Sequence, residues 1–423
     1  MTESAIQSQQ NPWPNLPPPT NSISLIITAA ISTAALLILA AFWVPVDITT
    51  RGTNLSANLF VELSPRGVVA TVLSTLDLGH GYYVLARHLF QALWLFLIVL
   101  QFSKSLSSQG TLGKESTVDV LLLSFLFCFN TVVFTTNGFG EFIDVVPYAL
   151  ILCALPIAFP SDSRITIMRW VVVTVLMVLA VMTHEKSIFD IAILIVWAAW
   201  KHGPRYSATL FLPSVIGSVW FLGLVSSDSN SAGMTVEDYL ESIRSGLAFM
   251  YEESFNVWGV LLSAGALWVI FLAAAYRFLK HRTGFSLQSF LVVALITLLC
   301  FAPLLVAHDT IRMVGLIWLP TILLICELDL KSLLKSIRFR QTALALCLVQ
   351  LLLPPILMYR HGVVPYNCYS REIANHLLPQ EAEVADVAAT PFALYTLDRK
   401  DISERIVCWP LRPIRGEHHL WPY

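Results

Sequence analysis

The sequence predicts an all-α fold, a polytopic membrane bundle of about eleven transmembrane helices. Of its 423 residues, 56% are hydrophobic and only 13% are charged, whereas a soluble globular chain carries about 25% charged residues. Apolar stretches close to the roughly 20 residues that a bilayer core requires recur along the chain. The formal net charge is -2, and no basic cluster with interleaved aromatic residues occurs, so a nucleic-acid partner is not expected.

The first transmembrane helix is predicted at 23–43, after a polar, Pro-rich segment at 1–22 that contains no Lys or Arg. We interpret 1–22 as a disordered cytoplasmic tail, because a secretory signal peptide would begin with a cationic region. The transmembrane bundle is expected to occupy 23–358. Its other apolar stretches are 84–103, 117–136, 143–160, 167–183, 188–201, 207–226, 256–276, 286–306, 312–328 and 341–358.

The distribution of Lys and Arg predicts the orientation of the bundle. Five alternate connections hold 13 basic residues, and the other set of connections holds fewer. The positive-inside rule assigns the basic set and the N-terminus to the cytoplasm. With an odd number of transmembrane helices, 359–423 is expected to form an extracytoplasmic tail. The 13 residues are Lys104, Lys114, Arg164, Arg169, Lys201, Arg205, Arg277, Lys280, Arg282, Lys331, Lys335, Arg338 and Arg340.

The chemically versatile residues lie mainly on the predicted outer connections, two of which are long, at 44–83 and 227–255. Three shorter outer connections carry charged clusters at the ends of transmembrane helices. A single acid at a helix end is explained by simple exposure, but ionisable groups at membrane depth usually face a bundle interior or a wet cavity. Three clusters together favour a common polar site, made of Glu141 and Asp144, of His184, Glu185 and Lys186, and of Asp309 and Arg312.

Individual residues suggest chemical roles for this site. Asp47 directly follows the first transmembrane helix and suits a general base or a metal ligand, or else an ordinary interfacial acid. Arg312 presents a fork of donors that matches a phosphate or a carboxylate, and a salt bridge to Asp309 is the alternative. Lys186 and His184 are further cations for a phosphate.

Seven cysteines fall into two groups. Five lie in the predicted transmembrane helices and are expected to act as small apolar packing residues. Cys368 and Cys408 lie in the predicted outer tail, where an oxidising compartment would allow them to form a disulfide.

A cytoplasmic N-terminus, a long first outer loop that opens with Asp47, and charged outer helix ends resemble the GT-C class of polytopic glycosyltransferases, over 23–358. The Asp-Asp or Asp-Glu pair frequent in that class is absent here. The charged segments 184–186 and 309–312 are also similar to those of bacterial envelope-polysaccharide membrane proteins, including surface-glycan polymerases.

The resemblance implies a glycosyltransferase of the bacterial inner membrane that takes a polyprenyl-phosphate-linked sugar as donor on the extracytoplasmic face. The acceptor would be a glycan or a lipid-linked glycan. A divalent metal, Mg²⁺ or Mn²⁺, could bridge the acids and the phosphate. A polymerase, a transporter or flippase, and a non-enzymatic scaffold are the alternatives. The implied roles are a general base for Asp47, with Glu141 or Asp144 as second choice, phosphate binding for Arg312, Lys186 and His184, and support from Glu185 and Asp309.

Overall fold

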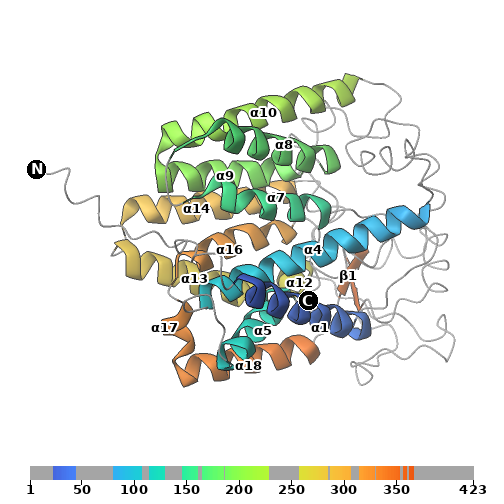
Figure 1. The fold of residues 1–423 in the computed structure, drawn as a ribbon, viewed down its shortest axis with the longest axis vertical. Helices are drawn as coiled ribbons and strands as arrows, with labels where there is room; N and C mark the ends of the chain where they lie inside the picture. Colours follow the sequence, from blue (N-terminus) through green and yellow to red (C-terminus); the bar gives the residue numbers. More distant parts are fainter. Residues whose placement is uncertain are drawn as a thin grey trace, which may run out of the picture.

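The computed structural model describes twelve stretches of the chain: 22–43, 80–106, 114–128, 145–160, 164–184, 186–227, 257–283, 286–305, 314–328, 330–352, 356–359 and 362–365. These residues are almost entirely helical, and most of the helices run roughly parallel or antiparallel to one another across the molecule (Figure 1). The predicted helical character is therefore confirmed for the described residues.

Each of the eleven predicted apolar stretches contains α-helix among its described residues. The α-helices are α1 (Ser22–Trp43), α4 (His80–Leu106), α5 (Lys114–Cys128), α7 (Val145–Ala158), α8 (Ile167–Thr183), α9 (Ser187–His202), α10 (Pro204–Ser227), α12 (Val257–Ala264), α13 (Ala266–Thr283), α14 (Leu287–Phe301), α16 (Trp318–Cys326), α17 (Leu330–Leu334) and α18 (Ile337–Leu352). Two 3₁₀ turns, η4 (Ala302–Leu305) and η5 (Gly315–Ile317), lie between α14 and α16.

Local chemistry explains several helix boundaries. The Thr166 side chain accepts a hydrogen bond from the backbone N–H of Arg169 at 3.2 Å and so caps the start of α8, as N-terminal Thr residues commonly do. Gly265 has φ +49° and separates α12 from α13, so the stretch predicted as one helix at 256–276 is broken. Gly203 has φ +94° and ends α9 just before α10 begins. Glycine adopts such backbone angles without the steric penalty of a Cβ.

The end of the last predicted helix, 341–358, differs from the structure. Helix α18 stops at Leu352, and the sequence continues with Pro354 and Pro355, which cannot donate helical hydrogen bonds. Strand β1 (Ile356–Tyr359) then pairs antiparallel with β2 (Gly362–Pro365). This hairpin packs against α12.

One end of the bundle, which we call the basic end, gathers the helix ends that the charge pattern assigned to the cytoplasm. Lys201 at the end of α9 donates to Glu327, which caps α16, with Nζ 2.6 Å from Oε1. The Tyr206 hydroxyl near the start of α10 donates to the carbonyl of Ala158 at the end of α7, at 2.6 Å. Gln101 near the end of α4 lies 3.5 Å from the sulfur of Cys326. Contacts between helix ends thus join α4, α7, α9, α10 and α16 at this end.

His202 completes the packing of the basic end, just beyond the predicted transmembrane stretch 188–201. Its ring stacks on Phe159 at a centroid distance of 6.2 Å and lies 4.7 Å from the ring of Tyr206. Burial, with the positive charges of Lys201 and Arg169, lowers the pKa of His202 to about 4. The imidazole is therefore neutral at physiological pH.

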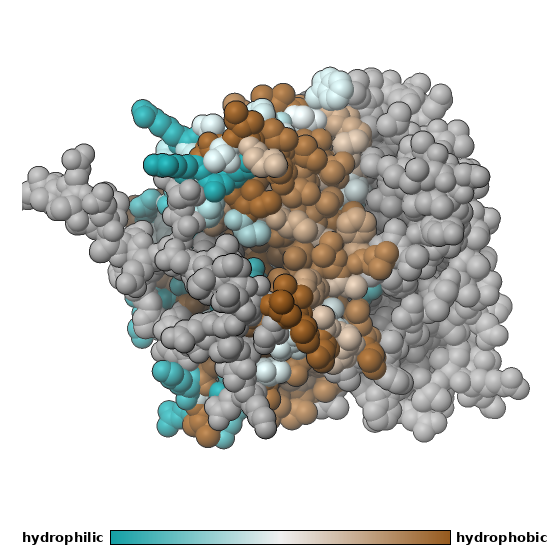
Figure 2. Space-filling model, viewed as in Figure 1, coloured by the Kyte–Doolittle hydropathy of each residue, from teal (hydrophilic) through white to brown (hydrophobic). Residues whose placement is uncertain are grey.

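The outer surface of the helices is strongly apolar. Figure 2 shows a broad hydrophobic band over the helices, with hydrophilic residues gathered at the end where α9 and α10 join. Exposed large side chains in this surface include Leu212, Ile216 and Trp220 on α10 and Leu287 and Leu298 on α14. Among the described residues, only α4 contains a stretch, Leu89–Leu106, that is long and apolar enough to cross a membrane. Other apolar helices or helix portions, such as Ile167–Thr183 and Leu287–Phe301, are shorter.

Candidate functional site

The turn between α8 and α9 lies at the opposite end of these helices from the basic end and carries two of the predicted site residues. His184 is extended, with φ -160°, and its backbone N–H closes α8 on the carbonyl of Ala180. The backbone N–H of Lys186 donates to Nδ1 of His184 at 3.3 Å, and Ser187 N–H donates to the His184 carbonyl at 3.1 Å. An Nδ1 that accepts a hydrogen bond assigns the proton of the neutral imidazole to Nε2.

Both described residues that were predicted to bind the phosphate are buried, and so is an acid that the sequence analysis did not single out. The exposed fraction is 1% for His184, 3% for Lys186 and 0% for Asp190. Lys186 and Asp190 are four residues apart, a spacing that puts two side chains on the same face of a helix. The sequence does carry a signal for Asp190, because it is the single ionisable residue between Ser187 and Trp200, and such residues within apolar helices are usually functional.

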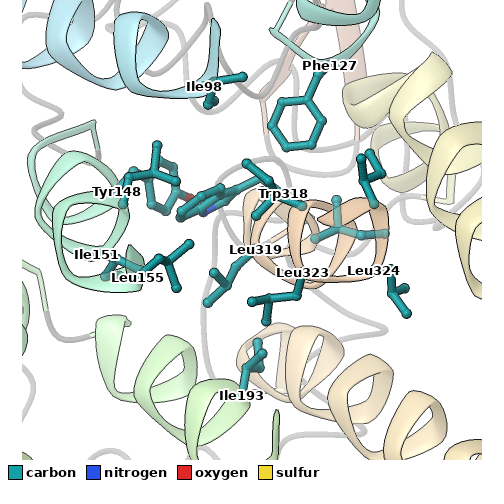
Figure 3. Close-up of a cluster of buried hydrophobic side chains, with 14 of the residues drawn as sticks. Ile98, Phe127, Tyr148, Ile151, Leu155, Ile193, Trp318, Leu319, Leu323 and Leu324 are labelled. Atoms are coloured by element: carbon teal, nitrogen blue, oxygen red, sulfur yellow. The ribbon is translucent and has the colours of Figure 1, made fainter. Parts of the chain in front are cut away.

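An aromatic cluster of Trp94, Tyr148 and Trp318 surrounds this position. The Nζ atom of Lys186 lies 4.8 Å from the centroid of the Tyr148 ring, within the range of a cation–π interaction. The Tyr148 ring lies 5.1 Å from that of Trp318 and 6.4 Å from that of Trp94, and the two indoles are 6.1 Å apart. Figure 3 shows Tyr148 on α7 beside Trp318 on α16, above the aliphatic side chains of the core. Composition alone could not identify these aromatic residues, since the chain has 12 Trp and 12 Tyr.

Helix α14 closes the cluster on a further side. The sulfur of Cys300 lies 3.7 Å from the carbonyl oxygen of Leu316 in η5, and α14 packs along α9. Described residues from α4, α7, α9, α14, η5 and α16 therefore converge in one buried region.

Most of the predicted site residues fall outside the described part of the chain, and their roles stay predictions. Two of the predicted clusters directly precede described stretches of the chain. Asp144 comes just before Val145, the first residue of α7, and Arg312 comes two residues before Val314. Tyr148 on α7 and Trp318, the first residue of α16 a few residues beyond Val314, have ring centroids 5.1 Å apart. The residues outside the description are Asp47, Glu141, Asp144, Glu185, Asp309, Arg312, Cys368 and Cys408.

Metal and thiol chemistry depends on which acids, histidines and cysteines lie together in the described stretches. In those stretches, no group of three or more His, Cys, Asp or Glu side chains could hold a metal ion. A role for Mg²⁺ or Mn²⁺ stays a prediction that depends on acids beyond these stretches. The cysteines that are described are all free, as expected for packing residues: Cys128, Cys153, Cys300, Cys326 and Cys347.

Comparison with known proteins gives no relative for this chain. No family model matches the sequence, and neither a curated protein nor a solved structure matches it. The fold and the site together define a predominantly helical bundle with a buried cluster of ionisable and aromatic residues at one end. Its function must therefore be argued from this chemistry.

Proposed function

We propose that the chain is a multi-pass protein of a bacterial inner membrane, with the basic end in the cytoplasm and the α8–α9 turn toward the extracytoplasmic face. The apolar outer surface supports this setting, because soluble monomers rarely expose contiguous apolar patches beyond a few hundred Å². The gathering of Lys and Arg at one end supports the orientation. Helices such as α9 and α14, shorter than about 20 residues, would cross with the help of adjoining turns and local bilayer thinning.

We further propose that the protein transfers a sugar from a polyprenyl-phosphate donor during assembly of a bacterial envelope polysaccharide. The observation that carries this proposal is the position of Lys186: a buried cation over Tyr148, at the end of the bundle opposite the basic end. The phosphate of a lipid-linked donor sits at headgroup level while its chain stays in the bilayer. An enzyme for such a donor needs cations at that depth, because negative charge grows on the departing phosphate.

The remaining chemistry of the transfer needs a carboxylate that takes a proton from the acceptor hydroxyl. Asp47 is our first choice for this base, and Glu141 or Asp144 is the second. Arg312 would add a bidentate contact to the phosphate. Transfer of one sugar and polymerisation of lipid-linked units require the same chemistry, so a surface-glycan polymerase belongs to the same proposal.

One observation favours a second candidate, a transporter or flippase. Asp190 is fully buried within a predicted transmembrane helix and lies one turn from Lys186. Buried ionisable pairs of this kind are found along ion and proton pathways. In such a protein Asp190 would be indispensable, whereas in a transferase it would tune the site.

The deciding experiment compares the surface-glycan profile of a deletion strain with strains that carry Lys186→Met, Asp47→Asn, Arg312→Ala or Asp190→Asn. Ser214→Ala is the matched control, because Ser214 is a buried polar residue on α10. A transferase predicts altered glycan in the deletion strain and in the first three variants, with normal protein levels in the membrane. The length distribution then separates a missing sugar from missing polymerisation.

Two other results would redirect the assignment. Unchanged glycan in the deletion strain would refute the glycan proposal. Lipid-linked intermediates that accumulate in the deletion strain and in Asp190→Asn, while the Asp47 and Arg312 variants behave normally, would favour the transporter.

A further inference from the structure

We propose that the N-terminal end of α9 is the phosphate-binding part of this site, with Ser187 and the indole N–H groups of Trp94 and Trp318 as donors beside Lys186. The proposal rests on the proposed function and specifies which atoms receive the lipid-linked substrate. Ser187, Trp94 and Trp318 carry no charge, and the sequence analysis assigned them no role.

The end of α9 is electrostatically suited to an anion. The helix has 16 residues, Ser187–His202, and Lys186 occupies its N-cap position with no side-chain capping hydrogen bond. The first turn of a helix presents N–H groups and a partial positive charge. A Lys at this position adds its charge to the partial positive charge of the helix end, a combination that suits an anion.

Ser187 supplies the independent observation. Its side chain is fully buried, and its hydroxyl has no hydrogen-bond partner in the described stretches. Ser187 is the first residue of α9 and the direct neighbour of Lys186. Such a hydroxyl can bind a ligand or a water. Its place beside Lys186 at the start of α9 distinguishes Ser187 from the other described buried hydroxyls without a partner, such as Ser214.

The two indole groups extend the set of donors. The Nε1 atoms of Trp94 and Trp318 are buried, and neither has a hydrogen-bond partner among the described residues. An indole N–H can only donate, so a suitable ligand must bring acceptors. Both rings lie within 6.4 Å of the Tyr148 ring, and Nζ of Lys186 lies 4.8 Å from that same ring. A cation, a hydroxyl and two obligate donors together match a phosphate, which is rich in acceptor oxygens and negatively charged.

Asp190 is the described acid in the first turn of α9. Its carboxylate would repel a phosphate bound at the N-terminal end of α9, and so Asp190 should weaken phosphate binding. Asp190→Asn should therefore tighten binding, whereas Lys186→Met should weaken it. An internal Lys186–Asp190 ion pair with no ligand predicts a different result, namely that both substitutions merely destabilise the fold.

The test measures binding of farnesyl phosphate to the purified full-length protein in detergent by calorimetry, with farnesol and inorganic phosphate as comparison probes. Lys186→Met should weaken binding by about tenfold or more, as expected for a lost charge-assisted hydrogen bond. Ser187→Ala should weaken it by roughly three- to tenfold, and Asp190→Asn should strengthen it. Trp318→Phe keeps the ring but removes the N–H, and should resemble Ser187→Ala. Ser214→Ala removes another buried hydroxyl, on α10, and should leave binding unchanged.

The binding measurements test the phosphate site independently of the proposed transferase function. Wild-type binding that is unaffected by both Ser187→Ala and Lys186→Met would overturn the site, and so would no binding of farnesyl phosphate. Should Lys186→Met fail to fold, the Ser187 and Trp318 variants decide. Inorganic phosphate bound as tightly as farnesyl phosphate would refute the lipid-linked source. If binding behaves as expected while the deletion strain has normal glycan, the site stands and the proposed transferase function fails.

Discussion

Replacing Glu327 by Gln should destabilise the basic end far more than the loss of one exposed charge would. Nζ of Lys201 and Oε1 of Glu327 are 2.6 Å apart, and the exposed fractions of the two side chains are 9% and 1%. The substitution leaves the Lys201 ammonium buried without its carboxylate. Removing one partner of such a pair strands a charge that water cannot reach.

The magnitude follows from the distance. At 2.6 Å and an effective dielectric constant of about 20, the attraction between two unit charges is about 6 kcal/mol. Part of it offsets the desolvation of both groups, so the expected loss in the free energy of unfolding is about 3–5 kcal/mol for Glu327→Gln. Lys201→Met should cost a similar amount. The double variant Lys201→Met/Glu327→Leu removes both charges and should recover most of the loss, since buried pairs are often replaceable by apolar groups.

Equilibrium unfolding in mixed micelles, followed by far-UV circular dichroism, measures all three variants. Arg338→Ala is the control, because Arg338 is an exposed cation near the start of α18 and should change stability by less than about 0.5 kcal/mol. If both single variants lowered the free energy of unfolding by less than about 1 kcal/mol, water would have to solvate the Lys201–Glu327 pair. A double variant as unstable as the sum of the singles would show that the two residues do not act together. Either result would refute the inference that Lys201 and Glu327 form a buried pair shielded from water.

Three further substitutions test other contacts. His202 has a folded pKa of about 4, below its ordinary value of 6.5, so the fold favours the neutral ring. The stability that the neutral ring contributes is fully present above pH 6.5 and is lost as the pH falls toward 4. His202→Phe should therefore make the free energy of unfolding less dependent on pH between 6.5 and 4. Gly217→Ala should lower the free energy of unfolding by about 1–3 kcal/mol, because a Cβ there would lie 2.9 Å from a methyl group of Val178. The double variant with Val178→Ala should recover this stability. A single variant as stable as the wild type would contradict the close approach of α8 and α10. Tyr206→Phe removes the 2.6 Å hydrogen bond to Ala158 and should lower the unfolding free energy by about 0.5–1.5 kcal/mol; no change would indicate that the hydroxyl is solvated in both states.

The sequence predicted the helices well because hydrophobicity over long stretches is a strong signal. Helix α8 begins and ends at the predicted residues, 167 and 183, since Thr166 caps one end and the charged turn after Thr183 begins the next connection. The break at Gly265 escaped prediction because an isolated Gly is tolerated inside many helices. The hairpin at 356–365 was missed because its strands are as apolar as the helix before them, and short apolar stretches do not distinguish strand from helix.

The candidate site could be predicted only in part. The position of His184 and Lys186 at a helix end followed from the sequence, but their burial under the aromatic cluster depends on contacts between α4, α7 and α16. Those contacts join residues as far apart as Trp94 and Trp318, and a single sequence holds no record of such pairs. Asp190 could have been predicted as a site residue, because the sequence shows it as a single acid within an apolar stretch.

In the proposed membrane setting, the tight turn between α8 and α9 has a consequence for how the two helices would be inserted. Helix α9 carries Asp190 near one end and Lys201 near the other. Each charge makes insertion of a lone helix less favourable, though by less than the roughly 3 kcal/mol that a charge costs at the bilayer centre. Helix α8 has no acid and is joined to α9 by only three residues, 184–186. In the proposed orientation α8 and α9 would be inserted together as one helical hairpin, and the favourable insertion of α8 would offset the cost of inserting α9. The charged residues near the two ends of α9 would thus make its insertion dependent on α8 during synthesis.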